Sequence, residues 1–108
     1  MIKVYISGAI TGTDDYMERF AKAEKVLTDL GYSVINPAKV NANLPVDTDY
    51  FEYMALSFAM LDICNAIFFL DGWEKSKGAC MEYGYSKAYG KQMFFEKDFK
   101  EVYNDKQG

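Results

Sequence analysis

Histidine is absent from this chain of 108 residues. Because histidine is the most common general base and the most common metal ligand, serine–histidine and cysteine–histidine catalytic sites are excluded. The two cysteines, Cys64 and Cys80, have a spacing that fits neither a zinc site nor a disulfide framework. We therefore expect reduced thiols, no metal and no cofactor, and any acid–base chemistry to depend on carboxylates and tyrosines.

Long apolar runs and dense basic runs are missing as well. The longest continuous apolar run, residues 66–70, is far too short to span a bilayer, and residues 1–7 do not resemble a secretory signal. The net charge is −4 and basic residues are dispersed, which argues against binding to a polymeric nucleic acid. These features predict a cytoplasmic protein that binds no membrane and whose partner is a small molecule.

What the chain does contain is apolar residues (50%) and aromatic residues (17%), enough for one domain, residues 1–108, to bury a core without disulfides. Strands are indicated by β-branched and aromatic runs, and helices by apolar residues three and four positions apart. In chain order, the prediction is strand 2–7, helix 16–30, strand 32–35, loop 38–47, helix 51–61, strand 66–70, helix 77–89 and strand 92–96.

The order of these elements predicts the fold. Alternating strands and helices indicate an α/β fold with one doubly wound sheet, flavodoxin-like or Rossmann-like, of four or five parallel strands with helices on both faces. Asp15 with Glu18, and Asp49 with Glu52, have the spacing of capping boxes at helix starts. The polar tail from Lys97 is expected to form a short helix or to fray.

Ligands of open α/β sheets bind beyond the carboxyl ends of the strands. Three loops are expected at that edge: residues 8–12, the segment that starts at Asn36, and residues 71–78. The glycine-bounded loop 8–12 is either a ligand-binding loop or an ordinary tight turn, since glycine permits both.

Four side chains near these loops each allow two interpretations. Glu82 has no basic residue three or four positions away, and on that evidence alone a solvated surface glutamate is favoured over a ligand-facing one. Tyr5 is either a core tyrosine or a sheet-edge residue whose hydroxyl contacts Glu82 or a sugar. Trp73 either stacks on a base or covers the core. Cys80, near a helix start, is favoured as an inert small residue over an activated thiol.

Three segments, two of which overlap, resemble a known family. Residues 4–12 (VYISGAITG) resemble the opening strand and loop of the nucleoside 2-deoxyribosyltransferase superfamily, and residues 76–88 (SKGACMEYGYSKA) resemble its catalytic helix. Residues 72–79 (GWEKSKGA) resemble short phage and bacterial members of unknown function. The likeness extends over nearly the whole chain. It implies cleavage of an N-glycosidic bond, or deoxyribosyl transfer, on a nucleoside or nucleoside 5′-monophosphate.

The resemblance also implies roles for individual residues. Glu82 matches the nucleophile that forms a covalent glycosyl-glutamate, and Tyr5 matches the tyrosine that orients it. We therefore expect Glu82 to face the cleft with the Tyr5 hydroxyl in hydrogen-bonding reach. Ser76 matches a serine that helps to hold phosphate in members acting on monophosphates. Ser57 stands where the family has an aspartate that protonates the leaving base, and Asn65 stands at a second frequent aspartate.

The loops and the resemblance together define the candidate site. Catalytic roles are expected for Glu82 and Tyr5, and substrate binding for Gly8, Ala9, Ile10, Asn36, Ser57, Asp71, Gly72, Trp73, Ser76 and Gly78. A non-catalytic nucleotide-binding or sensing module is the alternative function, favoured by Ser57 at the acid position. A structural or partner-binding domain is a third possibility, but it leaves residues 72–82 unexplained. The resemblance further implies a homo-oligomer, because members of the family complete their site with a neighbouring subunit.

Overall fold

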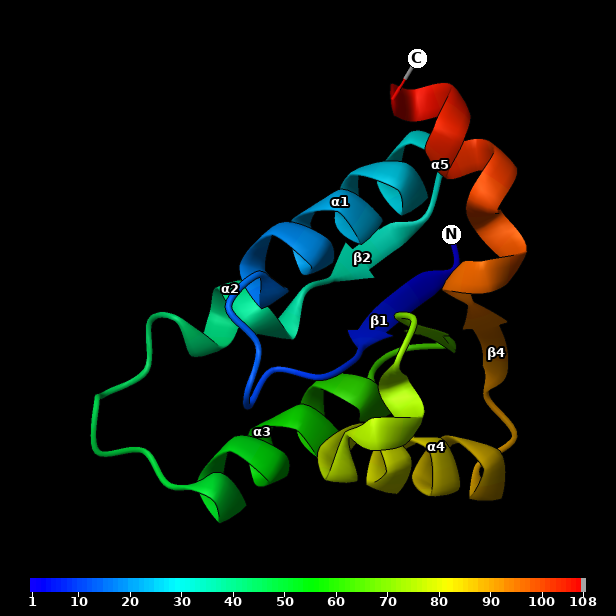
Figure 1. Ribbon diagram of the computed structural model, residues 1–108. Helices are drawn as coiled ribbons and strands as arrows, with labels where there is room; N and C mark the ends of the chain where they lie inside the picture. Colours follow the sequence, from blue (N-terminus) through cyan, green and yellow to red (C-terminus); the bar gives the residue numbers. More distant parts are fainter. Residues whose placement is uncertain (108) are drawn as a thin grey trace.

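The computed structural model describes residues 1–107, with side chains described as far as Asn104. Its elements are β1 (Lys3–Ser7), α1 (Tyr16–Asp29), β2 (Ser33–Ile35), α2 (Pro37–Asn41), α3 (Tyr50–Asp62), β3 (Ala66–Phe69), the 3₁₀ turn η1 (Trp73–Lys75), α4 (Lys77–Ala88), β4 (Gln92–Phe95), the 3₁₀ turn η2 (Glu96–Phe99) and α5 (Lys100–Gln107). Figure 1 shows the sheet between two layers of helices.

The sheet has four strands in the order β2-β1-β3-β4, and every neighbouring pair is parallel. Ile6 pairs with Phe68, and Phe68 pairs with Phe94, so β3 lies between β1 and β4 and α4 forms the crossover from β3 to β4. The predicted doubly wound parallel sheet is confirmed. The direction of winding changes between β1 and β3, because β2 follows β1 on one side and β4 follows β3 on the other.

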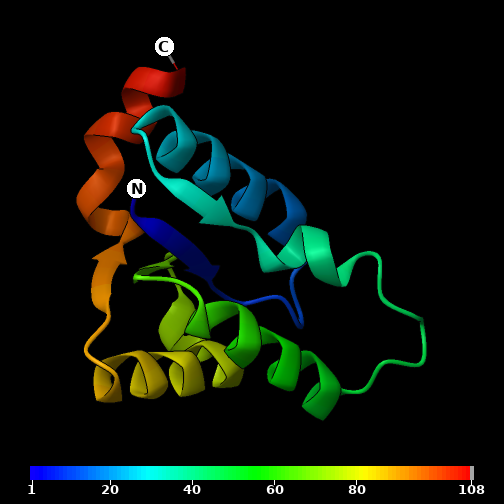
Figure 2. The same ribbon diagram turned by 180° about the vertical axis from the view of Figure 1, so that it is seen from behind.

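Side chains of the strands alternate between two cores. Val4, Ile6 and Phe68 pack with α1 and with Tyr103 of α5 on one face. Tyr5 and Ile67 belong to the second core, on the face covered by α3 and α4. The reverse view in Figure 2 shows the same separation, with α1 on one side of β1 and both α3 and α4 on the other.

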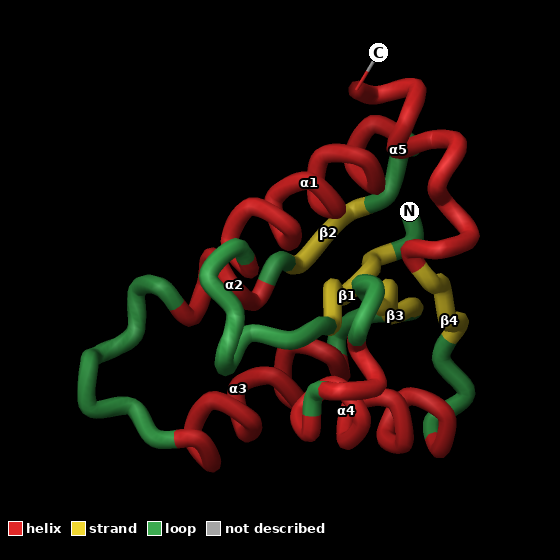
Figure 3. Tube along the Cα trace, in the orientation of Figure 1, coloured by secondary structure: helices red, strands yellow, loops and turns green. Residues whose placement is uncertain are grey.

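Two local predictions differ from the structure, the loop 38–47 and the cap at Asp15. The segment 38–47 is not wholly a loop, because Pro37–Asn41 forms α2. Asn36 accepts hydrogen bonds from the amides of Ala38 and Lys39, and proline occupies the first turn, where its missing amide costs nothing. A helix of this length is too short to show an apolar period. The rest of the segment is the long loop between α2 and α3 in Figure 3.

The two predicted caps have different outcomes. Asp49 and Glu52 form a capping box at the start of α3, as expected. Asp15 precedes α1 but makes no side-chain cap, because its carboxylate pairs with Arg19 at 3.0 Å. The tail from Lys97 is helical, forming the end of η2 and then α5 as far as the structure describes it.

Candidate functional site

A cavity of about 600 Å³ opens at the carboxyl end of β1. Its volume lies in the range of small-molecule sites. The walls come from β1 and the loop that follows it, from α1, α2 and α3, and from the start of α4. The lining residues are Tyr5, Ile6, Ser7, Gly8, Ala9, Ile10, Thr11, Tyr16, Phe20, Pro37, Ala38, Asn41, Ala42, Tyr50, Tyr53, Met54, Ser57, Lys75, Ser76, Lys77, Gly78, Ala79 and Glu82.

Glu82 is buried at the wall of this cavity, with 5% of its surface exposed. The Tyr5 hydroxyl donates to Glu82 Oε2 at 2.7 Å, and the Ser7 hydroxyl donates to Glu82 Oε1 at 2.6 Å. Tyr5 and Ser7 are two positions apart on β1, so both side chains point to the face that α4 covers. The expected contact between Tyr5 and Glu82 is therefore present. The interpretation of Glu82 as a solvated surface residue is wrong.

The charges around Glu82 follow from this geometry. Burial raises the pKa of Glu82 from its ordinary value, whereas the hydrogen bonds from Ser7 and Tyr5 favour the ionised carboxylate and oppose that rise. The pKa of Tyr5 lies well above 10, first because of burial and then because of the nearby Glu82 charge, while a hydrogen bond from Ser57 acts in the opposite direction. Tyr5 is thus held as a neutral hydroxyl that donates to a carboxylate.

Ser57 and two glycines shape the space beside this carboxylate. Ser57 of α3 is buried and lines the cavity. A Cβ at Gly8 would lie 2.8 Å from Leu70 Cδ1, so the loop after β1 can approach the end of β3 only without a side chain there. A Cβ at Gly78 would lie 3.3 Å from Met54 Sδ, where α4 approaches α3. Ala9 and Ile10 continue the cavity wall beyond Gly8.

The start of α4 gives the cavity mouth a positive character. Ser76 caps the helix by accepting a hydrogen bond from the Ala79 amide at 3.2 Å. Lys75 and Lys77 flank Ser76, are exposed, and line the cavity. The positive end of the helix dipole adds to these two ammonium groups.

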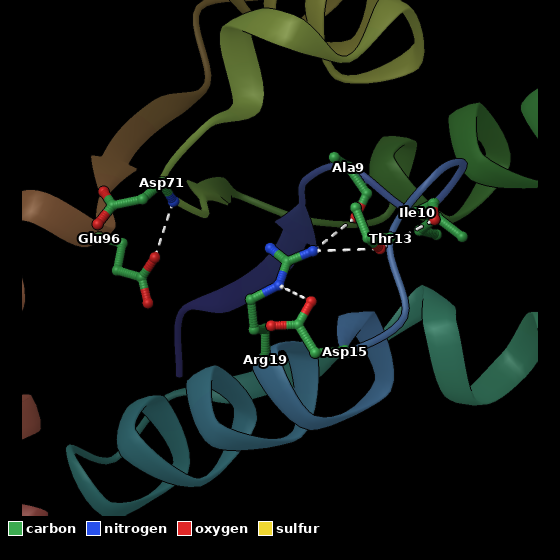
Figure 4. A network of polar contacts seen from close by, with 7 residues as sticks. All are labelled: Ala9, Ile10, Thr13, Asp15, Arg19, Asp71 and Glu96. Carbon is green, nitrogen blue, oxygen red and sulfur yellow. Dashed lines mark hydrogen bonds and ion pairs between the residues drawn. The ribbon is translucent and has the colours of Figure 1, made fainter.

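Arg19 fixes the loop between β1 and α1, as Figure 4 shows. Its guanidinium donates to the Ala9 carbonyl at 3.0 Å and reaches Thr13 Oγ1 at 3.4 Å, while its Nε pairs with Asp15. Thr13 in turn donates to the Ile10 carbonyl at 3.0 Å. Side chains of Arg19 and Thr13 thus hold the carbonyls of Ala9 and Ile10, two residues of this loop that line the cavity.

Four residues expected at the site lie elsewhere. Asn36 caps α2 and its amide donates to Glu24. Asp71 pairs with Lys100 at 2.6 Å, and its backbone amide donates to Glu96, a contact also drawn in Figure 4. Gly72 and Trp73 line a separate recess of about 440 Å³ on the β4 side of the sheet.

Trp73 and Asn65 have structural contacts that explain their positions. The Trp73 ring stacks on Tyr83 with ring centroids 5.0 Å apart, and it also packs against Phe69, so it covers the second core. Asn65 Oδ1 accepts a hydrogen bond from the Lys3 amide at 2.9 Å, at the amino ends of β1 and β3. Asn65 is therefore at the edge of the sheet opposite the cavity.

Sequence reasoning missed several residues that line the cavity. Of these, Ser7 could have been predicted most readily, because it lies two positions after Tyr5 on the same strand and its side chain therefore points to the same face of the sheet. Lys75 and Lys77 flank a residue that was predicted. Tyr50 and Tyr53 could not be predicted as cavity residues, because apolar and aromatic residues surround the helix α3 and its sequence does not distinguish the face that lines a cavity.

Two further findings concern metal ions and membranes. The described residues contain no group of three or more Cys, Asp or Glu side chains that could hold a metal ion. No helix in the described part of the chain is long and apolar enough to cross a membrane.

Comparison with known proteins agrees with this fold and places the chain in a family. The structure is similar to that of a 2-deoxyribosyltransferase from Bacillus psychrosaccharolyticus, with a TM-score of 0.66 and 25% sequence identity over 86% of this chain and 70% of that one. A search of curated protein sequences finds no match to this chain. The chain thus has a nucleoside 2-deoxyribosyltransferase-like fold, of the flavodoxin-like type. A family described as a domain of unknown function (DUF4406) matches residues 2–95, and the chain belongs to that family.

Proposed function

We propose that this chain cleaves the N-glycosidic bond of a nucleoside or nucleoside 5′-monophosphate and passes the sugar to water or to a second base. The observation that carries the proposal is the state of Glu82, a buried carboxylate at the wall of a nucleotide-sized cavity with a hydroxyl donor on each oxygen. The structural likeness to a 2-deoxyribosyltransferase supports the same reading.

In the proposed mechanism, a Glu82 oxygen attacks C1′ of the sugar and forms a glycosyl ester as the base departs. Water or a second base then attacks C1′ and releases Glu82, as in retaining glycosidases. Tyr5 and Ser7 fix the direction of the carboxylate and leave it negatively charged, because a hydroxyl donates a hydrogen bond without contributing a formal charge. A lysine or arginine in their place would weaken the nucleophile.

The mouth of the cavity favours a phosphorylated substrate. Ser76, with its hydroxyl oxygen accepting from Ala79, still has its own hydrogen to donate to a phosphate oxygen. Lys75, Lys77 and the end of α4 supply positive charge beside it. We therefore expect a nucleoside monophosphate to bind more tightly than the matching nucleoside. Equal affinities in calorimetry would exclude a phosphate-binding role for Ser76.

The alternative proposal is a nucleotide-binding or sensing module without catalysis. Glu82 is the sole carboxylate among the described residues that line the cavity, so no aspartate or glutamate is present to protonate a leaving base. In this case the same cavity would bind the ligand without breaking it.

One experiment separates the two proposals. The protein is incubated with a panel of nucleosides and monophosphates, in ribose and 2′-deoxyribose forms, and free base is measured by chromatography. The enzyme proposal predicts base release that Glu82→Gln abolishes while the circular dichroism spectrum stays native. Intact-mass measurement of the quenched reaction should show a sugar attached to the wild-type chain alone. Binding without base release in any reaction would support the sensing module.

The proposal includes a cytoplasmic location and a homo-oligomeric assembly. The location is supported by two unpaired cysteines, one of them the buried Cys64, whose thiol pKa burial raises to about 11. Cell fractionation tests the location, and sedimentation velocity tests the assembly, where a monomer at micromolar concentration would contradict it.

A further inference from the structure

Within one chain, the described residues that line the main cavity include one carboxylate, Glu82, and no second carboxylic acid. Among its described lining residues, the groups that carry an ionisable proton besides Glu82 are the hydroxyls of serine, threonine and tyrosine and the ammonium groups of Lys75 and Lys77. In general, these groups are far weaker acids than a carboxylic acid. Burial and the nearby Glu82 charge make Tyr5 a still weaker acid, because they raise its pKa well above 10.

The lack of a second carboxylic acid among these residues limits which bases can leave. A neutral purine or pyrimidine departs from C1′ as an anion unless it receives a proton, and a positioned general acid is worth about 10²–10⁴ in rate. Glu82 cannot serve as that acid while it is the nucleophile. A base that already carries a positive charge departs as a neutral molecule and needs no proton.

The arrangement of charge and aromatic rings fits such a base. The carboxylate of Glu82 and the rings of Tyr16, Tyr50 and Tyr53 line the same cavity, and the exposed Lys75 and Lys77 line it at the start of α4. Aromatic rings attract cations that lie over their faces. A nucleotide with a cationic base and an anionic phosphate would thus find a carboxylate and aromatic rings for its base, and two ammonium groups for its phosphate, in one cavity.

We propose that the substrates of this site are nucleotides whose leaving base is a cation, the shared chemistry of N-glycosylated pyridinium and 7-alkylpurine compounds. This inference rests on the proposed function, since it uses Glu82 as the nucleophile. It adds the class of base that the site can release.

The steps balance without an acid from the protein. A Glu82 oxygen forms a bond to C1′, the C1′–N bond breaks, and its electron pair neutralises the positive ring. Water then attacks C1′, Glu82 leaves as a carboxylate, and the proton from water passes to solvent. The products are a neutral base, a sugar phosphate and one proton.

The test uses substrate pairs that differ in the charge of the base. One pair is 7-methylguanosine 5′-monophosphate and guanosine 5′-monophosphate, and the other is nicotinamide mononucleotide and its reduced, uncharged form. Each compound is supplied as ribose and 2′-deoxyribose forms, and the Glu82→Gln protein gives the background for spontaneous cleavage. The expected result is a kcat/KM at least about 10²-fold higher for the cationic member of one or both pairs.

The pH dependence gives a second readout. For nicotinamide mononucleotide, whose pyridinium charge does not titrate, kcat/KM should not rise as the pH falls from 8 to 6, since no proton is needed. Neutral bases, where cleaved at all, should be cleaved faster at low pH, because only their protonated fraction reacts. The two pairs distinguish a pyridinium from a 7-alkylpurine as the preferred base.

Three outcomes would overturn the inference. Cleavage of the neutral members at rates equal to the cationic ones, without acceleration at low pH, would refute it while leaving the proposed function intact. The same holds where neutral nucleosides from the wider panel are cleaved and neither cationic compound is. Absence of Glu82-dependent cleavage for every compound would refute the proposed function together with this inference.

Discussion

Replacement of Tyr5 by phenylalanine removes one oxygen atom and leaves a buried carboxylate oxygen without its hydroxyl donor. Tyr5 is 1% exposed and Glu82 is 5% exposed, so water does not readily replace the lost contact. A hydrogen bond to a charged group contributes about 1.5–3 kcal/mol to stability. We expect Tyr5→Phe to lower the free energy of unfolding by this amount at pH 7.5.

The loss should be smaller in acid. The pKa of Glu82 is raised in the folded protein, so the stabilising effect of its protonated form is fully present below the ordinary value and is lost as the pH rises through the raised value. At pH 4, below the ordinary pKa of a glutamate, the raised pKa favours the protonated form of Glu82, and the missing bond is then mainly one between neutral groups, worth about 0.5–1.5 kcal/mol. Tyr5→Phe should therefore cost more at pH 7.5 than at pH 4.

Urea denaturation at the two pH values measures this difference, in the wild-type background and with Glu82→Gln. In the glutamine background the cost of Tyr5→Phe should be the smaller, neutral value at both pH values. Tyr32→Phe is a matched control, since Tyr32 packs against Phe94 in the core on the other face of the sheet. An equal cost of Tyr5→Phe at both pH values, or a cost unchanged by Glu82→Gln, would refute the electrostatic reasoning.

Three further predictions concern the same site. Glu82→Gln should make the protein more stable than wild type at pH 7.5, and this advantage should shrink towards pH 4, because the buried glutamate titrates and the glutamine does not. An equal or greater advantage at pH 4 in urea denaturation would contradict this. Replacing Lys75 and Lys77 together by methionine should weaken binding of a nucleoside monophosphate at least about tenfold and that of the nucleoside little, as measured by calorimetry. Gly8→Ala should lower the free energy of unfolding by about 1–3 kcal/mol, because the new Cβ lies 2.8 Å from Leu70 Cδ1; a change below about 0.5 kcal/mol would show that Leu70 yields easily.

The fold could be predicted because its signals are local. Residues 66–70 form a continuous apolar run, and β3 is buried on both faces, as such runs predict for parallel sheets. The capping box of Asp49 and Glu52 lies within one turn of sequence. The helix α2 was missed because its local signals are ambiguous. The asparagine cap at Asn36 and the proline after it mark the end of a strand as well as the start of a helix.

The site could be predicted only in part, because its contacts join distant parts of the chain. The bond from Tyr5 to Glu82 spans 77 residues and that from Ser7 spans 75, so helical spacing around Glu82 carried no information about either partner. The rule that ligands bind beyond the carboxyl ends of the strands predicted the correct edge of the sheet. It could not predict which residues between β3 and α4 face the main cavity. Ser76 and Gly78 line that cavity, whereas Gly72 and Trp73 line the separate recess beside β4.

The choice of donors for Glu82 connects its stability to its chemistry. A cation beside a buried carboxylate would lower the energy of the charged form, but it would also hold the electron pair that a nucleophile must donate. Hydroxyls from Tyr5 and Ser7 satisfy both oxygens and leave that charge available. Burying the charge still destabilises the folded state, and the apolar packing of Leu61, Ile67 and Phe69 in the same core as Tyr5 offsets this destabilisation. If Glu82 acts as the proposed nucleophile, the described lining residues offer no second carboxylic acid, and we expect the site to break bonds whose leaving group departs without a proton.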